Sequence, residues 1–135
     1  MSTISFSRWA SLAEAVTHYQ DALDAFAGEV RRRFAFSWAI DEEYQLTAEQ
    51  AQAYVDVGYT GTPGDTVQSW ADATGNSAQW AADDILTTRD AYVAALEGVR
   101  RIRLTAKAQM AAASTARDVK AVYDTAYAQL DAIAP

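Results

Sequence analysis

Apolar residues recur at alternating steps of three and four along the N-terminal part of the chain. They are Trp9, Leu12, Val16, Tyr19, Leu23, Phe26 and Val30. A mean step of about 3.5 residues is typical of a helix with one apolar stripe, as in coiled coils and helical bundles. The helix is expected to start at Ser7 or Ser11, and Ser11 forms a capping box with Glu14 three residues later. We therefore predict a helix through this stripe, which we call the heptad seam.

The heptad seam has two interpretations. Its aromatic side chains make it broader than a two-stranded coiled coil prefers, which favours packing against helices of the same chain. Self-association through the seam is the alternative, and the seam residues are then contacts between copies. His18 lies beside the seam without a carboxylate or a second histidine at metal-binding spacing, so we expect a surface or edge residue.

The pattern of the next segment, residues 34–46, fits two kinds of secondary structure. Phe34, Phe36, Trp38 and Ile40 alternate as in a strand, yet Phe34 and Trp38 also stand at the i, i+4 spacing of a helix. We predict a helix or a link here, with a strand pair completed by a partner as the alternative, because an isolated hairpin is marginally stable. Phe34, Phe36 and Trp38 are candidate partner contacts.

A corner between helices is predicted in the middle of the chain. Thr47 and Gln50 form a capping box for a helix to about Val57, and residues 58–64 hold three glycines and a proline, which end it. Asp65 or Thr66 is expected to cap a short helix that ends at Gly75, and Asn76 or Ser77 to begin the next. Core packing is the expected role of the tryptophans. The predicted corner residues are Gly58, Pro63, Trp70, Gly75 and Trp80.

The last part of the chain has the pattern of one long helix. The helical pattern continues from Ser77 to Ala113, which predicts a helix about 55 Å long at 1.5 Å per residue. Thr115 and Asp118 are spaced for a new helix start, so the helix is either broken near residue 114 or continuous. The middle of this helix is basic, and its candidate partner contacts are Arg100, Arg103 and Lys107.

Together these elements predict an all-α, elongated helical hairpin or bundle. The first helix and the long C-terminal helix are expected to pack antiparallel, with a short helix–corner–helix cap. We expect a single helical domain over residues 1–135, composed of segments 1–46, 47–75 and 76–135. Alanine supplies much of the 50% hydrophobic content, which favours long helices with thin contacts.

The net charge and the apolar pattern of the chain argue against several classes of binding partner. A net charge of −7 argues against nucleic acid and anionic membranes as partners. The corner resembles a helix-turn-helix in length, but Asp83 and Asp84 stand where a DNA reader carries Arg, Asn or Gln. No apolar run approaches the roughly 20 residues of a membrane-spanning helix, and the N-terminus lacks the pattern of a signal peptide.

The sequence offers no recognisable catalytic chemistry. It has no cysteine and one histidine, and the glycine-rich loop lacks the Lys-Ser/Thr of a phosphate-binding P-loop. Asp83 and Asp84 are adjacent, so they point in different directions on a helix and cannot chelate an ion together. We expect a protein that is not an enzyme and that carries no cofactor and no metal.

Residues 54–110 carry the motifs GYTG, a proline-containing loop, VQSWADATG, AADDIL, and IRL followed by Lys107. This pattern resembles a small helical domain found among the tail and tail-fibre proteins of tailed bacteriophages. The resemblance implies a virion structural protein that is assembled in the host cytoplasm. Its expected partners are other virion proteins, including a tail fibre, and further copies of the chain in a homo-oligomer. The alternative is a tail-fibre assembly chaperone or adaptor that is absent from the mature particle.

Overall fold

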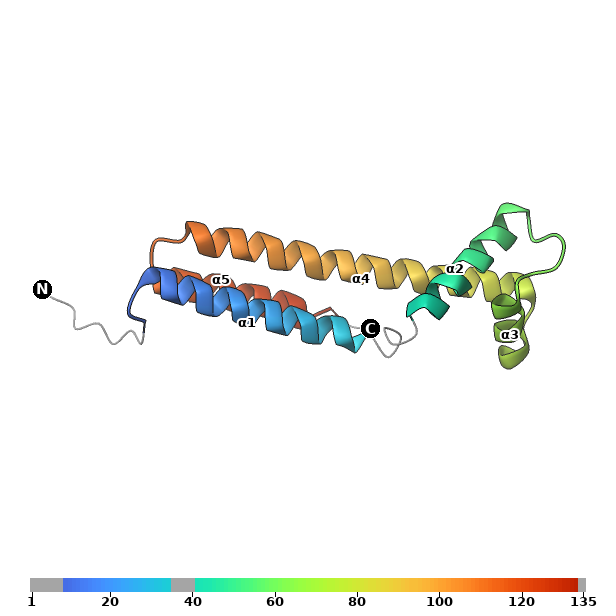
Figure 1. Cartoon of the computed structure of the whole chain (residues 1–135), viewed down its shortest axis with the longest axis horizontal. Coiled ribbons are helices and arrows are strands. Elements are labelled where there is room, and N and C mark those ends of the chain that lie inside the picture. The colour runs from blue at the N-terminus through green and yellow to red at the C-terminus, as the bar shows by residue number, and fades with distance from the viewer. Residues whose placement is uncertain (1–8, 35–40, 134–135) are drawn as a thin grey trace, which may run out of the picture. The chain divides into compact units, whose positions relative to one another are not determined.

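A computed structural model describes residues 9–34 and 41–133 of the chain, and those residues are helical with short connections (Figure 1). The helices are α1 (Leu12–Arg33), α2 (Asp41–Asp56), α3 (Asp65–Thr74), α4 (Ala78–Ala112) and α5 (Ala116–Asp131). No β-strand occurs within the described ranges. The predicted all-α fold is therefore confirmed.

The chain forms two compact units. Unit 1 consists of Met1–Arg33 and Leu96–Pro135, and unit 2 consists of Phe34–Ala95. Unit 1 contains α1, α5 and the C-terminal part of α4, whereas unit 2 contains α2, α3 and the N-terminal part of α4. The long helix predicted from the sequence thus contributes residues to both units.

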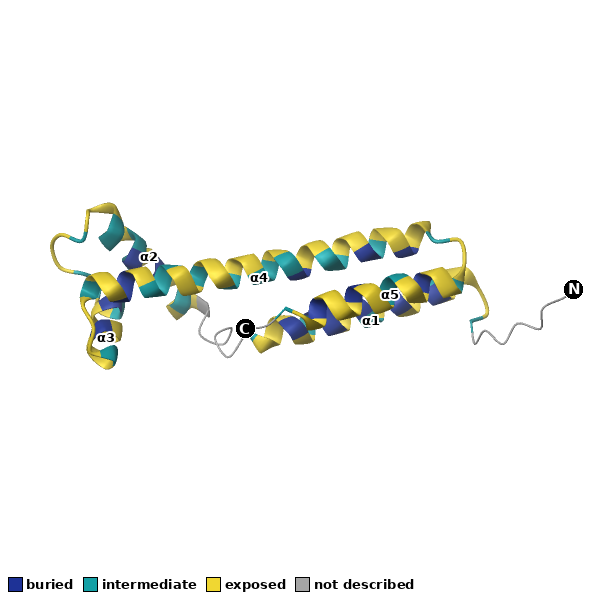
Figure 2. Cartoon of the chain, turned by 180° about the vertical axis from the view of Figure 1, so that it is seen from behind, coloured by how far each residue is buried: buried dark blue, intermediate teal, exposed yellow. Residues whose placement is uncertain are grey.

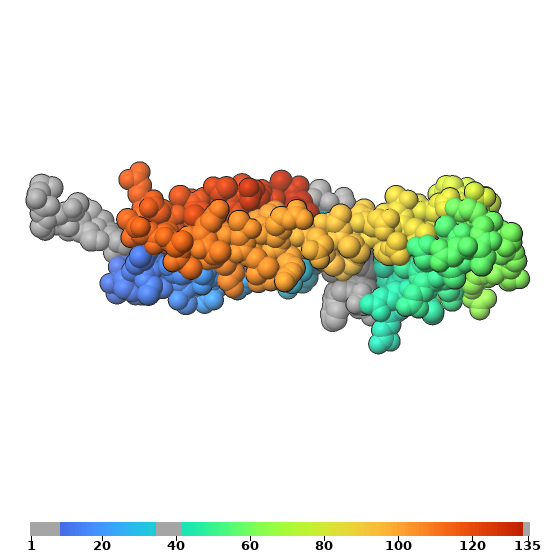
Figure 3. All heavy atoms as spheres, turned by 90° about the horizontal axis from the view of Figure 1, so that it is seen from above, coloured from blue at the N-terminus to red at the C-terminus, as the bar shows by residue number. Residues whose placement is uncertain are grey.

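In unit 1, α1 runs parallel to α5 and antiparallel to α4. The ring centroids of Tyr19 and Tyr123 lie 5.2 Å apart, and those of Phe26 and Tyr127 lie 3.8 Å apart. Residue numbers therefore rise in the same direction along α1 and α5. Asp24 forms an ion pair with Arg103, and the Gln20 side chain donates a hydrogen bond to the carbonyl of Lys107. Residue numbers therefore rise in opposite directions along α1 and α4. The predicted antiparallel packing of the first and the long helix is confirmed. Figure 3 shows α4 between α1 and α5 on this face of unit 1.

The core of unit 1 is built from aliphatic side chains of all three helices. Its largest fully buried members are Leu23, Val30, Val99, Met110, Val119 and Leu130. Figure 2 shows buried segments of α1 and α5 in dark blue. Burial of such side chains contributes about 1.5–3 kcal/mol each, so the stripe is the main source of stability in this unit.

Hydrogen bonds at helix starts fix the ends of the helices in unit 1. The Ser11 hydroxyl accepts from the Glu14 N–H at 3.1 Å, and the Glu14 carboxylate accepts from the Ala10 N–H at 3.2 Å. Thr115 accepts from the Asp118 N–H at 3.1 Å and is the N-cap of α5. Both predicted caps are confirmed, and the break near residue 114 exists.

Unit 2 has a core of small side chains. Ala51, Val67, Ala71, Ala81 and Ala82 are buried at 0–2% exposure, and larger apolar residues of α2 and α4 pack around them. Small residues at a helix contact let the backbones approach closely. The three helical segments of this unit therefore meet with little room for larger side chains.

The predicted helix–corner–helix between α3 and α4 is confirmed. Gly75 adopts the left-handed conformation, with φ 70°, and the Asn76 N–H donates to the carbonyl of Ala71 at 3.0 Å. Glycine suits this position because it has no Cβ to clash in the left-handed region. Ser77 then accepts from the Trp80 N–H at 3.1 Å and caps α4.

The predicted starts of α2 and α3 are wrong. α2 begins at Asp41, so Thr47 lies inside it and donates to the carbonyl of Glu43 instead of capping. The N-cap of α3 is Gly64, without a side-chain cap. Gln50 of α2 replaces that cap, because its side-chain oxygen accepts from the N–H of Thr66 at 3.0 Å and from its hydroxyl at 2.7 Å.

Two glycine-to-alanine substitutions are expected to change stability in opposite directions. Gly75→Ala should lower the free energy of unfolding by about 1 kcal/mol, because alanine is strained at positive φ. Gly98→Ala should raise it by roughly 0.5–1 kcal/mol, since Gly98 lies within α4 and an added Cβ would only touch Ile133 at 3.6 Å. Urea denaturation followed by circular dichroism measures both. If both substitutions shifted the denaturation midpoint in the same direction, the opposite roles assigned to Gly75 and Gly98 would be wrong.

Candidate functional site

The structure buries the central part of the heptad seam within one chain. Tyr19, Leu23, Phe26 and Val30 are 0–8% exposed, and the tyrosine and phenylalanine rings contact α5. Packing within the chain, the first of the two interpretations, is confirmed for these residues. They therefore have no surface to offer a second copy while unit 1 is folded.

The N-terminal end of the seam is more open. Leu12 is 37% exposed and Val16 is half-buried. Trp9 is also half-buried, and its ring lies 4.6 Å from that of His18 and 5.5 Å from that of Tyr19. His18 is exposed, as predicted for an edge residue. Of the seam, this end alone has exposed apolar surface.

The candidate contacts of segment 34–46 fall partly outside the described residues, as Phe36 and Trp38 do. Phe34 is half-buried, and its ring lies 6.5 Å from that of Tyr92. Residues 41–46 form the first turns of α2, so the helical interpretation is confirmed for that part.

Two of the three basic candidates on α4 are engaged within the chain. Arg103 and Lys107 contact opposite oxygens of Asp24 at 3.2 and 2.7 Å, whereas Arg100 is exposed. Burial acts to raise the Asp24 pKa, but hydrogen bonds from Lys107 and Arg103 outweigh it and lower the pKa below the usual value. These ion pairs join α1 to α4 and fix their position along each other.

Asp24→Asn should destabilise the protein by about 1 kcal/mol at neutral pH, a small value because the pair is partly solvated. A lowered folded pKa means that the carboxylate contributes stability above about pH 3.9, its unfolded value, and loses it as pH falls through the folded pKa. The wild-type and variant stabilities should therefore converge below about pH 4. Thermal denaturation across pH measures this effect.

Asp21→Asn is the matched control for this prediction, because Asp21 is exposed on the same helix. It should leave both the stability at neutral pH and its pH dependence close to those of the wild type. A constant gap between Asp24→Asn and wild type from pH 7 to pH 3 would contradict the role assigned to the cluster.

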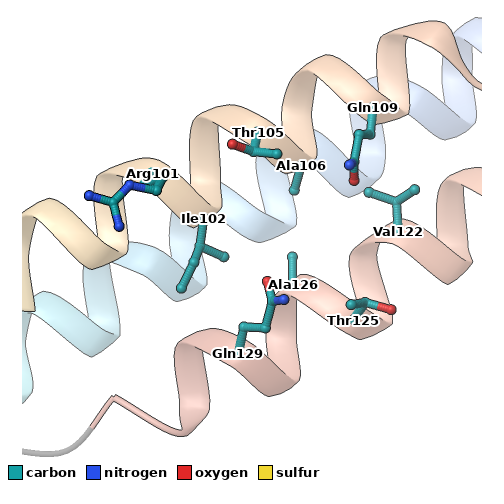
Figure 4. A pocket seen from close by; sticks show the side chains of 9 residues that line it. All are labelled: Arg101, Ile102, Thr105, Ala106, Gln109, Val122, Thr125, Ala126 and Gln129. Carbon is teal, nitrogen blue, oxygen red and sulfur yellow. The ribbon is translucent and has the colours of Figure 1, made fainter.

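A groove of about 510 Å³ separates α4 from α5 in unit 1 (Figure 4). Ala106 and Ala126 point toward each other across it, and Ile102 and Val122 extend the apolar part. Gln109 and Gln129 add amide groups from the two helices. The lining is neutral and mixed, except for Arg101 at one end, and it singles out no class of ligand.

A second groove, of about 590 Å³, lies in unit 2 between α2, α3 and α4, and we call it the Trp70 groove. Its lining includes Tyr44 and Thr47 from α2, Ser69 and Trp70 from α3, and Asp84 and Ile85 from α4. The indole N–H of Trp70 donates to the Asp84 carboxylate at 2.9 Å. An aromatic surface and a carboxylate are thereby held side by side.

The two corner tryptophans are not core residues, and the expectation of core packing is wrong for both. Trp70 is 42% exposed and Trp80 is 41% exposed. The core positions of α3 are taken by Val67 and Ala71, whose small side chains fit the close approach of the helices. The other corner residues, Gly58 and Pro63, lie in the connection between α2 and α3, where Gly58 has φ 68°.

Sequence reasoning did not identify the Trp70 groove as a site. Asp84 entered only as evidence against DNA binding and against metal chelation, and Tyr44 was assigned no role. Burial raises the pKa of Tyr44, and the neighbouring Tyr92 and Asp84 raise it further. One signal was available, because Trp70 and Asp84 stand on opposite sides of the predicted corner, where two helices meet.

Within residues 9–34 and 41–133, no three His, Asp or Glu side chains gather as a metal-binding set. No helix in these ranges is long and apolar enough to cross a membrane. Comparisons of the chain with protein-family models, with curated proteins and with solved structures found no match.

Proposed function

We propose that this chain is a structural protein of a tailed bacteriophage, associated with the tail or tail fibre, which acts by protein–protein assembly and not by catalysis. The resemblance of residues 54–110 to a helical domain of phage tail and tail-fibre proteins supports this assignment to the tail. The proposed location is the virion, and the proposed partners are other virion proteins, including the tail fibre and further copies of this chain.

The observation that carries an assembly role is the exposure of Trp70 in a groove. Trp70 is 42% exposed and its indole N–H is hydrogen-bonded to Asp84, which restricts the orientation of the ring at the surface. Tryptophan is enriched among the residues that dominate the energy of protein interfaces. A fixed orientation also reduces the entropy lost on binding.

The distribution of charge supports the same role. Unit 2 contains ten acidic residues and one basic residue, whereas unit 1 contains eight acidic and ten basic residues. Charge of one sign on a binding unit steers complementary partners and rejects others. Because the central part of the seam is buried, contacts between copies would use its open N-terminal end or other exposed surfaces of the two units.

Quantitative mass spectrometry of purified phage particles beside infected-cell lysate tests the proposal. We expect the chain in the particles at a fixed ratio to known tail proteins. Its presence in the lysate alone would favour the alternative, an assembly chaperone or adaptor that leaves before the particle is complete. A gene located outside any phage or prophage genome would contradict both functions.

A further inference from the structure

We infer that the Trp70 groove binds an arginine side chain presented by a segment of a partner protein. The identification of the occupant as a protein segment rests on the proposed assembly function. The preference for arginine rests on the groove itself, through its charge, its hydrogen-bonding groups and its aromatic surface.

Most polar groups of the groove are left as hydrogen-bond acceptors. The hydroxyl of Thr47 donates to the carbonyl of Glu43, that of Ser69 to the carbonyl of Thr66, and that of Thr66 to Gln50. The indole N–H of Trp70 donates to Asp84. The oxygen lone pairs of the three hydroxyls and of the Asp84 carboxylate remain, so the groove suits a ligand that only donates, which is the property of guanidinium.

The charge of the groove selects a cation. Glu43 from α2 and Asp84 from α4 both line it, and no basic residue does. Unit 2 as a whole has only Arg89 to oppose ten acidic residues, and Arg89 contacts Asp90 at 2.9 Å. A phosphate or carboxylate ligand would meet repulsion here, whereas an arginine gains charge-assisted hydrogen bonds.

The arrangement of Trp70 favours arginine among cations. A guanidinium is planar, stacks on an aromatic face and presents a fork of N–H donors to a carboxylate. The groove offers both partners together, since the Trp70 indole is hydrogen-bonded to Asp84 at 2.9 Å. Ile85 and Ala73 add apolar surface for the methylene groups of the arginine or for its neighbours.

A neutral sugar is the main competing ligand, because sugars also stack on tryptophan. A sugar hydroxyl both donates and accepts, so a sugar site requires donors as well as acceptors. Four donor groups of this groove are already engaged within unit 2. The balance therefore favours a ligand rich in donors over a sugar.

The test follows the indole N–H signal of Trp70 in nitrogen-15-labelled full-length protein by NMR, assigned with Trp70→Phe. The probe is the peptide acetyl-Ala-Leu-Arg-Leu-Ala-amide, compared with the same peptide carrying glutamine at the centre and with methyl glucoside. We expect a saturable shift with the arginine peptide, at an affinity about 10-fold higher than for the glutamine peptide. The difference should shrink as salt is added.

Asp84→Asn is the informative variant, because the amide oxygen can still accept the indole hydrogen bond while the charge is removed. It should abolish most of the preference for arginine, and Glu43→Gln should reduce it. Asp72→Asn is the matched control, since Asp72 is an exposed acid of α3 outside the groove lining. It should leave the affinity within about twofold of the wild type, because screened charges at a distance act weakly.

Several outcomes would overturn the inference. They are equal binding of the arginine and glutamine peptides, a shift with methyl glucoside but not with peptide, or equal losses in Asp84→Asn and Asp72→Asn. The last of these would assign binding to the general acidity of unit 2. Because the titration needs no phage, its failure is distinguishable from failure of the proposed function, which the particle analysis tests separately.

Discussion

Leu23→Asp is expected to unfold unit 1. Leu23 is 0% exposed on α1, so the substitution removes a buried aliphatic side chain and places a carboxylate in its position. Loss of the leucine alone costs about 2–5 kcal/mol, and burial of a charged group adds several more. The total is comparable to the whole stability of a typical domain, about 5–15 kcal/mol.

Circular dichroism should show this as a loss of helical signal at 25 °C, and light scattering reports any change of mass. Leu12→Asp is the matched control, because Leu12 lies on the same helix and seam but is 37% exposed. It should leave helicity almost unchanged. A folded Leu23→Asp protein with the wild-type melting temperature would show that the position is not a core site.

Ala51→Leu is expected to have the largest effect on unit 2. Ala51 is 0% exposed and lies in the cluster with Val67, Ala71, Ala81 and Ala82. A leucine needs space that closely approaching helices do not leave, so α2 must move away from α3 and α4. Overpacking of this kind costs about 1–3 kcal/mol.

Hydrogen exchange measured by mass spectrometry localises this effect, because peptides from residues 41–95 should exchange faster while those from α1 and α5 keep their protection. Ala53→Leu is the control, since Ala53 is exposed on the same helix and the change of side chain is identical. Similar exchange in both variants would mean that the small side chains of this cluster are not required for packing.

The elements that were predicted from the sequence depend on local signals. The steps of the heptad seam located α1, and the capping residues Ser11, Ser77 and Thr115 marked true helix starts. A cap acts over three residues, so its signal is readable without knowledge of the fold. The same holds for Gly75, whose left-handed conformation ends α3.

The features that the sequence did not reveal depend on residues far apart in the chain. Gln50 caps α3 from another helix, and Asp24 meets Arg103 and Lys107 only when α1 and α4 lie side by side. Tyr59 adopts φ 60°, which is unusual for tyrosine, and its hydroxyl donates to Asp83 at 2.6 Å. Local propensity opposes such a conformation, and two contacts accompany it: this side-chain hydrogen bond and the one from the Tyr59 N–H to the Tyr54 carbonyl at 2.9 Å.

The position of Trp70 was mispredicted for a related reason. Its spacing with Val67 and Ala71 places the three residues near one another on α3, and hydrophobicity alone assigns the tryptophan to the core. The structure buries the two smaller residues and leaves Trp70 42% exposed. Close approach of helices favours small side chains, and that constraint is not visible in the pattern of one helix.

The alanine-rich core of unit 2 also affects how its stability varies with temperature. The heat capacity of unfolding grows with the apolar area that unfolding exposes, by about 0.45 cal/K/mol per Å². Alanines expose little such area, whereas the Leu, Met and Val core of unit 1 exposes much more. The free energy of unit 2 should therefore follow a broad, shallow curve against temperature, and that of unit 1 a narrower and more strongly curved one.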